Sequence, residues 1–291
     1  MVIVRLMGGL GNQLFQYAVA RHLAEIHKTV LKIDISGFKR YKSRKYYLSA
    51  FKLRENFTTD EEVRPLVFKK CGIIGKLIAR SQFEFLRPSI KYIKERHFHF
   101  DPEILKSDDN VYLDGYWQSE RYFSDINDII RREFEIKSPQ EGRNKELAEQ
   151  IASVESVSLH IRRGDYIDNS KTQRVHGCCG MDYYNKCVEY ICERVSNPHF
   201  FVFADDPEWS RKNLNFPFPL TLVDHNGDDK CYEDLRLMSQ CKFHIIANST
   251  FSWWGVWLNV NPSKIVLAPK KWFRSNKYDT KDLYPTSWIK I

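Results

Sequence analysis

Two adjacent arginines and a carboxylate follow an apolar segment in the middle of the chain, in the run Ser158-Leu159-His160-Ile161-Arg162-Arg163-Gly164-Asp165. Residues 154–161 interleave β-branched and apolar side chains with serines, which predicts a buried strand, and Gly164 permits a sharp turn after it. Side chains at the carboxyl end of a parallel strand face the crevice in which such sheets bind ligands. Because a guanidinium can grip two phosphate oxygens at once, the run predicts a phosphate site. A purely structural Arg–Asp pair is the alternative.

Two further polar runs are expected at strand ends. Ser249 or Thr250, between Asn248 and Phe251, is expected to cap a helix whose free N–H groups attract an anion, and helix capping alone is the alternative. The pair Asp205-Asp206 could bind a metal. Beside an arginine pair, however, we expect these carboxylates to recognise a ribose or a base edge.

A glycine loop, Gly8-Gly9-Leu10-Gly11-Asn12, lies between a strand expected at 2–6 and a helix expected at 13–27. Backbone N–H groups at such a helix start attract anions. With Asp34 ending the next strand, the loop is also close to a dinucleotide-binding fingerprint. Leu14, however, occupies the position of the third glycine in that fingerprint. We therefore expect an anion at the loop and keep an NAD(P)-dependent oxidoreductase as an alternative.

The order of elements predicts two α/β domains. Strands are expected at 2–6, 30–35 and 111–113, with helices at 13–27 and 121–133. After a polar linker at 137–144, strands are expected at 154–161, 199–204, 220–223, 243–246 and 264–267, with helices at 181–195, 231–240 and 250–259. Strands that alternate with helices predict a parallel sheet covered on both faces. We place the domains at 1–140 and 141–291, with a last helix crossing back to the first domain.

Composition narrows the class of protein. A chain of 291 residues with 43% hydrophobic and 14% aromatic residues is typical of folded proteins. We find no apolar run near the roughly 18 residues of a membrane span and no signal peptide, so we expect a cytoplasmic protein. Seven cysteines without regular spacing fit reduced thiols. Cys178 and Cys179 beside His176 lack the spacing of a zinc site, so no metal is expected there.

The formal net charge of +8 is concentrated in the first half of the chain. Residues 1–140 hold 25 Lys and Arg against 18 Asp and Glu, whereas residues 141–291 hold 20 against 19. The densest stretch, 38–54, interleaves basic and aromatic side chains. This pattern suits RNA, anionic lipid or an acidic substrate, with a solvated surface loop as the alternative. A basic RNA-binding protein is thus a second alternative function.

Together these runs resemble the motifs of bacterial α-1,2-fucosyltransferases. The resemblance covers residues 8–17, 115–120, 160–165, 203–206 and 248–254, in the expected order, and leaves 37–110 unmatched. It implies an α/β fold of the B type found in glycosyltransferases, with two Rossmann-like domains facing a cleft. It also implies transfer of L-fucose from GDP-β-L-fucose to the 2-hydroxyl of a galactoside, with inversion and without a metal or other cofactor.

The resemblance also implies roles for individual residues. Arg162 would grip the β-phosphate, while Gly9, Gly11 and Asn12 would close over the phosphate and fucose. His160 and Asp205 would lie near guanosine, and Ser249, Thr250 and Phe251 would meet the phosphates. Arg163 and Asn248 complete the expected donor-binding set.

We expect Arg162, Asn12 and Asp165 to be the catalytic residues. Asp165 is the candidate base, although holding Arg163 in place is an equal alternative for it. His22 and Glu120 are weaker candidates.

We expect the acceptor to be a galactose-containing oligosaccharide, either free or carried on a lipid pyrophosphate as in O-antigen synthesis. The basic 38–54 stretch would then hold the enzyme peripherally on the anionic inner face of the cell membrane, since each basic residue near such a surface adds about 1 kcal/mol. No nucleic-acid partner is expected in this interpretation.

Overall fold

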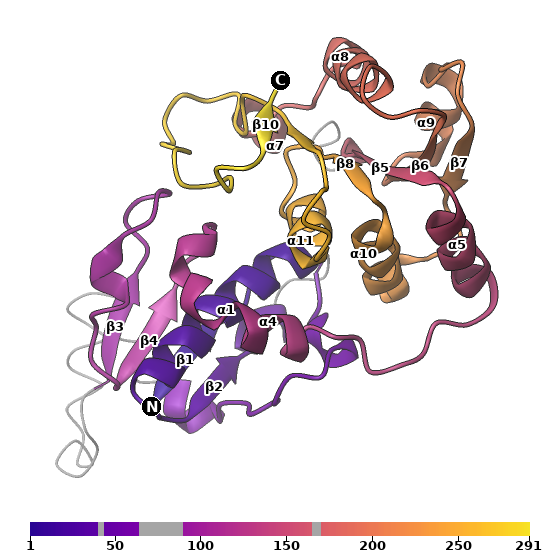
Figure 1. The fold of residues 1–291 in the computed structure, drawn as a ribbon. Coiled ribbons are helices and arrows are strands. Elements are labelled where there is room, and N and C mark those ends of the chain that lie inside the picture. Colours follow the sequence, from indigo (N-terminus) through magenta and orange to yellow (C-terminus); the bar gives the residue numbers. More distant parts are fainter. Residues whose placement is uncertain (40–43, 64–89, 165–169) are drawn as a thin grey trace, which may run out of the picture. The chain divides into compact units, whose positions relative to one another are not determined.

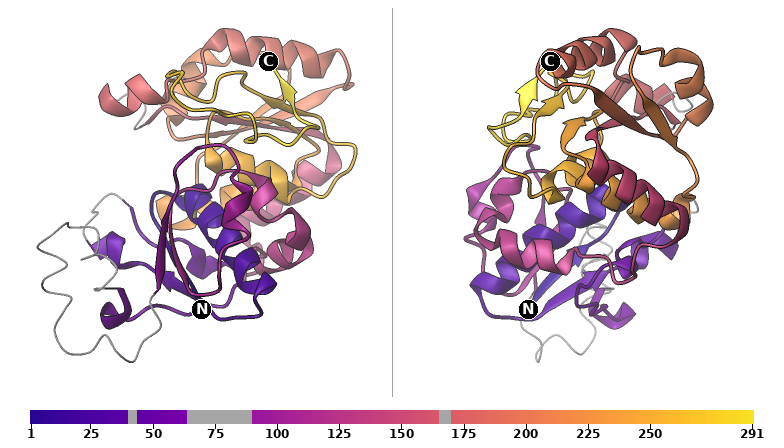
Figure 2. Two further views of the ribbon diagram at one scale, coloured as in Figure 1. Left: turned by 90° about the vertical axis from the view of Figure 1, so that its left-hand side faces the viewer. Right: turned by 45° about the vertical axis from the view of Figure 1, so that its right-hand side comes forward.

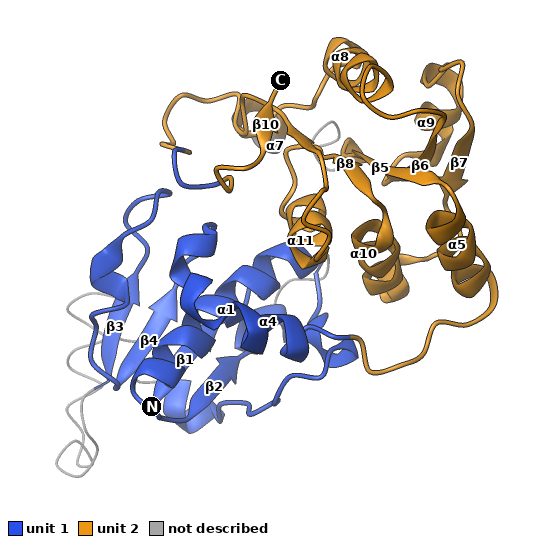
Figure 3. Ribbon diagram, viewed as in Figure 1, with its two compact units in different colours: residues 1–135, 281–283 blue, residues 136–280, 284–291 orange. Residues whose placement is uncertain are grey.

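The computed structural model describes residues 1–39, 44–63, 90–164 and 170–291. The chain forms two compact units (Figure 3). Unit 1 comprises residues 1–135 and 281–283, and unit 2 comprises residues 136–280 and 284–291. The chain therefore passes from unit 1 to unit 2 between Glu135 and Ile136, close to the predicted boundary at 140.

Unit 1 contains a four-stranded parallel sheet with the order β2-β1-β4-β3 (Figure 1). The strands are β1 (Val2–Arg5), β2 (Leu31–Asp34), β3 (Lys91–Lys94) and β4 (Val111–Asp114). Helix α1 (Leu10–Ile26) packs against β1 and β2. Most residues of α1 are buried, polar ones included, which explains why its pattern in the sequence is not strongly amphipathic.

The helix predicted at 121–133 forms only in its second half. Two short 3₁₀ turns, Glu120–Tyr122 and Ser124–Ile126, precede α4 (Asn127–Glu133). Between them Phe123 has φ −145° and a fully buried side chain. This φ lies outside the helical range, so a continuous helix does not pass through Phe123.

Unit 2 contains a six-stranded sheet in which every pairing is parallel, with the order β10-β9-β8-β5-β6-β7. Its strands are β5 (Glu155–Ile161), β6 (Pro198–Ala204), β7 (Leu220–Val223), β8 (Phe243–Ile245), β9 (Val266–Ala268) and β10 (Ile289–Lys290). The described α-helices are α5 (Gly142–Ser153), α7 (Ser170–Val175), α8 (Met181–Cys192), α9 (Pro207–Asn213), α10 (Cys231–Gln240) and α11 (Thr250–Leu258).

The two faces of this sheet carry separate apolar cores. Val157, Leu159 and Ile161 of β5 pack with α8, whereas Phe201 and Phe203 of β6 pack with α5 and α10. Alternate residues of a strand point to opposite faces, and both faces are apolar here because both are covered. Figure 2 shows helices on the two sides of this sheet. The predicted parallel sheet with helices on both faces is confirmed.

The predicted last helix is wrong. Residues 269–288 form turns and irregular backbone, and the chain then pairs β10 with β9. Pro269 and Pro285 interrupt this segment, and each restricts the residue before it to extended conformations. A short part of it, residues 281–283, belongs to unit 1, where the Asp282 carboxylate accepts a hydrogen bond from Arg121 at 2.7 Å.

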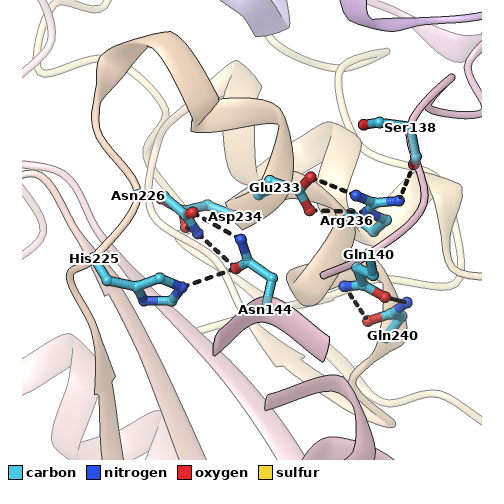
Figure 4. A network of polar contacts seen from close by, with 9 residues as sticks. All are labelled: Ser138, Gln140, Asn144, His225, Asn226, Glu233, Asp234, Arg236 and Gln240. Carbon is cyan, nitrogen blue, oxygen red and sulfur yellow. Dashed lines mark hydrogen bonds and ion pairs between the residues drawn. The ribbon is translucent and has the colours of Figure 1, made fainter. Parts of the chain in front are cut away.

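A polar network ties α5 and the segment before it to the rest of unit 2 (Figure 4). Asn144 of α5 exchanges two hydrogen bonds of 2.9 Å with Asn226, and Asn226 also donates to the Asp234 carboxylate at 2.7 Å. Arg236 of α10 donates to the Ser138 carbonyl at 2.8 Å. Burial raises the pKa of the Asp234 carboxyl to about 7.

No helix in the described ranges is long and apolar enough to cross a membrane.

Candidate functional site

The arginine motif lies at the carboxyl end of β5, an inner strand of the sheet of unit 2. Strand β5 pairs with β6 on one side and with β8 on the other, and the β6 pairing ends with Ile161 opposite Ala204. This register sets Arg162 beside Asp205 at the next strand end. Their side chains form an ion pair of 2.9 Å, and each is about one quarter exposed.

The Asp205 carboxylate also accepts a hydrogen bond of 2.8 Å from the backbone N–H of Arg163. A Cβ atom on Gly164 would lie 2.8 Å from the other oxygen of this carboxylate. Only glycine leaves Asp205 in its present place. Gly164 was expected to permit a turn. The structure shows that it also leaves room for Asp205, the carboxylate that pairs with Arg162.

Arg163 points to a different set of groups. Its guanidinium lies 4.0 Å from the centre of the Trp209 ring, a cation–π contact, and its Nε atom is 3.6 Å from the Asp206 carboxylate. Asp206 in turn caps α9 by accepting from the N–H of Trp209 at 3.0 Å. Trp209 carries no signal in the sequence other than its spacing from the Asp205-Asp206 pair.

His160 precedes the arginines and is 5% exposed. Burial, and to a lesser degree the charge of Arg162, lower the pKa of His160 to about 3, so its imidazole is neutral at physiological pH. Its Nδ1 atom is buried and has no hydrogen-bond partner among the described residues. Its ring lies 5.7 Å from that of Phe251. The structure thus brings two of the predicted runs together at one edge of the sheet.

The third run opens α11 as predicted. Ser249 is the capping residue, and its side chain accepts from the N–H of Phe251 at 3.3 Å. Thr250 is the first helical residue, and no acidic side chain lies in the first turn. Helix starts of this kind favour anions.

Asn248, the first residue of this run, is buried, and its side chain contacts backbone carbonyls of other segments. It is 2% exposed, and its Nδ2 atom lies 3.1 to 3.2 Å from the carbonyl oxygens of His176, Gly177 and Trp272. Its amide therefore joins the start of α11 to two other loop segments, one at His176 and Gly177 and one at Trp272.

The glycine loop of unit 1 is shorter than predicted. Helix α1 already begins at Leu10 with Gly9 as its capping residue, so Gly11 and Asn12 lie in the first helical turn. Gly8 has φ +78°, and a Cβ there would lie 2.5 Å from Nδ2 of Asn12. A residue with a side chain would be strained at this position and would displace Asn12.

Two glutamines surround this loop, and the sequence analysis assigned neither to the site. Gln13 is fully buried and donates to the carbonyls of Gly8 and Lys45 at 3.0 and 2.8 Å, while accepting from the N–H of Tyr47 at 2.9 Å. Gln118 donates to Oδ1 of Asn12 at 3.1 Å. Leu14, which argued against a dinucleotide, is fully buried.

The basic stretch 38–54 is described only in part, because residues 40–43 lie outside the described ranges. Lys39 and Lys52 form exposed ion pairs with Asp60 and Glu135. The Arg44 guanidinium approaches within 4.0 Å of the place where Gly9 would carry a Cβ. Asp165, the candidate base, lies outside the described residues.

Comparison with known proteins decides the family. The model of glycosyl transferase family 11 matches residues 1–291, the whole chain. The protein belongs to glycosyl transferase family 11. This family member is 35% identical to the α-1,2-colitosyltransferase of Escherichia coli over 100% of its own length and 98% of the relative. It is 31% identical to an O-antigen biosynthesis glycosyltransferase of the same species, WbnK, over 98% and 99% of the two chains.

A rat galactoside α-(1,2)-fucosyltransferase 1 is 25% identical to the family 11 chain over 57% of its length and 45% of the relative. The resemblance to α-1,2-fucosyltransferases is confirmed. Among solved structures, the NodZ α-1,6-fucosyltransferase of Bradyrhizobium aligns with a TM-score of 0.51 and 17% identity, over 88% of the family 11 chain and 92% of NodZ. The predicted two-domain B-type glycosyltransferase fold is confirmed.

Proposed function

We propose that this glycosyltransferase moves L-fucose from GDP-β-L-fucose to the 2-hydroxyl of a galactoside, in α-1,2 linkage and with inversion. The observation that carries the proposal is the polar edge of the sheet in unit 2. There Arg162, a neutral buried His160 and the start of α11 lie at the carboxyl ends of neighbouring strands. Membership of a glycosyltransferase family leaves the oxidoreductase and RNA-binding alternatives without support.

The chemistry of the transfer explains why a fixed cation is needed. Breaking the bond between fucose and GDP leaves new negative charge on the β-phosphate while the sugar becomes oxocarbenium-like. We assign this charge to Arg162, helped by Ser249, Thr250 and Phe251 at the start of α11. Gly9, Gly11 and Asn12 are assigned to the phosphate and fucose, and Asp205 to guanosine with His160. The proposal includes no metal ion and no other cofactor.

Asp165 is the proposed base for the acceptor hydroxyl. Its alternative role is to hold Arg163, whose guanidinium lies over the Trp209 ring and whose buried Nε atom, 3.6 Å from the Asp206 carboxylate, makes no hydrogen bond among the described residues. A base that titrates gives the pH–rate profile an acidic limb. Asp165→Asn should remove that limb while GDP affinity is retained, and loss of GDP affinity would instead indicate a structural role.

A second donor, GDP-colitose, is favoured by one specific observation. A relative that aligns over the whole chain at 35% identity is named a colitosyltransferase. Colitose has one ring hydroxyl fewer than fucose, so the two donors differ by one polar contact. A site that hydrogen-bonds a substrate hydroxyl discriminates strongly against an analogue that lacks it.

One panel tests the proposal. Thermal stabilisation is measured with GDP, UDP, CDP, NADH and an EDTA control, and product formation is measured with GDP-fucose and GDP-colitose on a galactoside. We expect stabilisation by GDP that EDTA does not abolish, and α-1,2-linked fucose in the product. Transfer of colitose alone would replace GDP-fucose with GDP-colitose as the donor and leave the proposed GDP site unchanged. Stabilisation by UDP or NADH instead of GDP would overturn the proposal.

A further inference from the structure

The segment after β4 in unit 1 has a backbone that is held in an unfavourable conformation. Trp117 has φ +56°, in the left-handed region that residues with a side chain rarely adopt, and it is 1% exposed. Gly115 cannot carry a side chain, because a Cβ there would overlap the Cβ of Glu95 and lie 2.8 Å from the Trp117 ring. Such conformations persist only where the surroundings force them, and they concentrate at functional sites.

Glu95 holds this segment in place. One carboxylate oxygen accepts the N–H of Tyr116 at 2.8 Å and the other accepts the N–H of Trp117 at 2.9 Å. Burial raises the pKa of Glu95, and these two hydrogen bonds act against the rise. The Glu95 carboxylate, just after β3, thus fixes the backbone that leads from β4 into Gln118.

Gln118 is poorly suited to a role in stability alone. It is 7% exposed, and its Oε1 atom is buried without a hydrogen-bond partner among the described residues. A buried carbonyl oxygen without a partner destabilises a fold, and an apolar side chain of the same shape would avoid this penalty. Its Nε2 atom, however, donates to Oδ1 of Asn12 at 3.1 Å.

We propose that Gln118 is a positioning residue for Asn12, and that the strained 115–118 segment is retained because it presents this amide to the first turn of α1. Hydrogen bonding at Oδ1 fixes which end of the Asn12 carboxamide is the acceptor and orients its Nδ2 atom as a donor. The inference rests on the proposed function, in which Asn12 contacts the phosphate or the sugar. It names a residue that acts on the reaction through Asn12 and needs no contact with the substrate.

The test exploits the conflict between stability and turnover. In Gln118→Met the buried oxygen disappears, so we expect the Tm to stay within a degree of the wild type or to rise. Turnover should fall roughly 10-fold to 100-fold, because a small misplacement of a contacting group is enough for such a loss. GDP affinity should fall by less than turnover does, because the other residues of the proposed donor-binding set are unchanged.

The matched control is Gln13→Met, the same substitution at a buried glutamine whose hydrogen bonds are all made. This variant should lower the Tm by several degrees. A fall of the Tm in Gln118→Met as large as that in Gln13→Met would show that Gln118 serves the fold, and the proposal would be wrong.

A double-mutant cycle with Asn12→Ala separates the remaining outcomes. If Gln118 acts through Asn12, Gln118→Met should reduce turnover by less than about 2-fold in the Asn12→Ala background. An equal loss in both backgrounds would overturn the proposal. Turnover is measured with whichever GDP-sugar the wild type uses, and the Tm comparison needs no substrate. A failure of the fucose assignment therefore leaves this test intact.

Discussion

The guanidinium of Arg162 and the carboxylate of Asp205 lie 2.9 Å apart at the carboxyl ends of β5 and β6. In the proposed function, one of these groups meets the diphosphate and the other meets guanosine. The pair therefore orients the cation before the nucleotide arrives, and the nucleotide competes with a carboxylate for it. Preorganised charge of this kind is effective in catalysis because it is already in place when charge develops.

Arg162→Lys should abolish most transfer while the protein stays folded. A lysine keeps the charge but cannot reproduce the planar fork that holds two oxygens. We expect a loss of roughly 100-fold to 1,000-fold in kcat, by analogy with removal of one preorganised donor. Steady-state kinetics and circular dichroism of the purified variant check this. Near-normal turnover would remove Arg162 from the role.

Asp205→Asn should show whether the Asp205 carboxylate recognises guanosine or only orients the Arg162 guanidinium. If the carboxylate contacts guanosine, the variant should bind GDP about 10-fold more weakly but bind inorganic pyrophosphate as well as the wild type does, or better. Pyrophosphate has no base, and in the variant it no longer competes with a carboxylate for Arg162. Isothermal titration with both ligands measures this. Equal weakening for the two ligands would restrict Asp205 to orienting Arg162.

Gly164→Ala should displace the Asp205 carboxylate, since the new methyl group would lie 2.8 Å from one of its oxygens. We expect GDP affinity to fall roughly 10-fold with a change in stability under about 1 kcal/mol, because the group that must move is a partly exposed side chain. Gly227→Ala is the matched control, because no atom lies within 4 Å of its added Cβ. Similar GDP affinity in the two variants would contradict the prediction.

Asp234→Asn should change the pH dependence of stability. Burial raises the pKa of Asp234 in the folded protein to about 7, above its ordinary 3.8, so the folded state keeps a proton that the unfolded state releases. The unfolding free energy therefore falls as the pH rises from about 4 to about 7. The neutral variant keeps the acceptor oxygen for Asn226 and should be more stable than the wild type at pH 8, by on the order of 1 kcal/mol.

Urea unfolding of wild type and Asp234→Asn at pH 5 and pH 8 measures this difference. Asp108→Asn, the same substitution at an exposed carboxylate of unit 1, is the matched control. Parallel curves for wild type and Asp234→Asn would show that Asp234 does not carry the effect.

The basic 38–54 stretch should bind anionic membranes, as proposed for an enzyme whose acceptor is carried on a lipid. We expect sedimentation with phosphatidylserine vesicles at low salt and release at high salt, because exposed charges are screened. The double variant Lys45→Gln/Arg54→Gln should weaken binding by about 2 kcal/mol, since each basic residue contributes about 1 kcal/mol. Equal binding of the wild type to neutral vesicles would refute the prediction.

The sequence predicts unit 2 well for a physical reason. Strands buried on both faces are continuous apolar runs, as in residues 200–203, and they can be read without knowledge of their neighbours. The polar run at each strand end then follows from parallel topology. This is why Arg162, Asp205 and Ser249 could be selected from sequence alone, although their roles stay predictions.

The parts that the sequence did not predict depend on contacts between distant residues. Gln118 and Asn12 are separated by 106 positions, and no local pattern announces their hydrogen bond. Nothing local distinguishes Asn248, whose amide contacts three carbonyl oxygens of two loops, from a residue that faces a ligand. The last helix was predicted from its position in the expected fold, and Pro269 and Pro285 prevail over that expectation.

The crowding around Gly115, which leaves no room for a side chain, has a consequence for mutational maps of this enzyme. In a saturation library scored by product, position 115 would reject every substitution and resemble a residue that touches the substrate. Its intolerance would report only that no methyl group fits between the ends of two strands. Such a map becomes interpretable when each variant is also scored for abundance, which separates crowding from recognition.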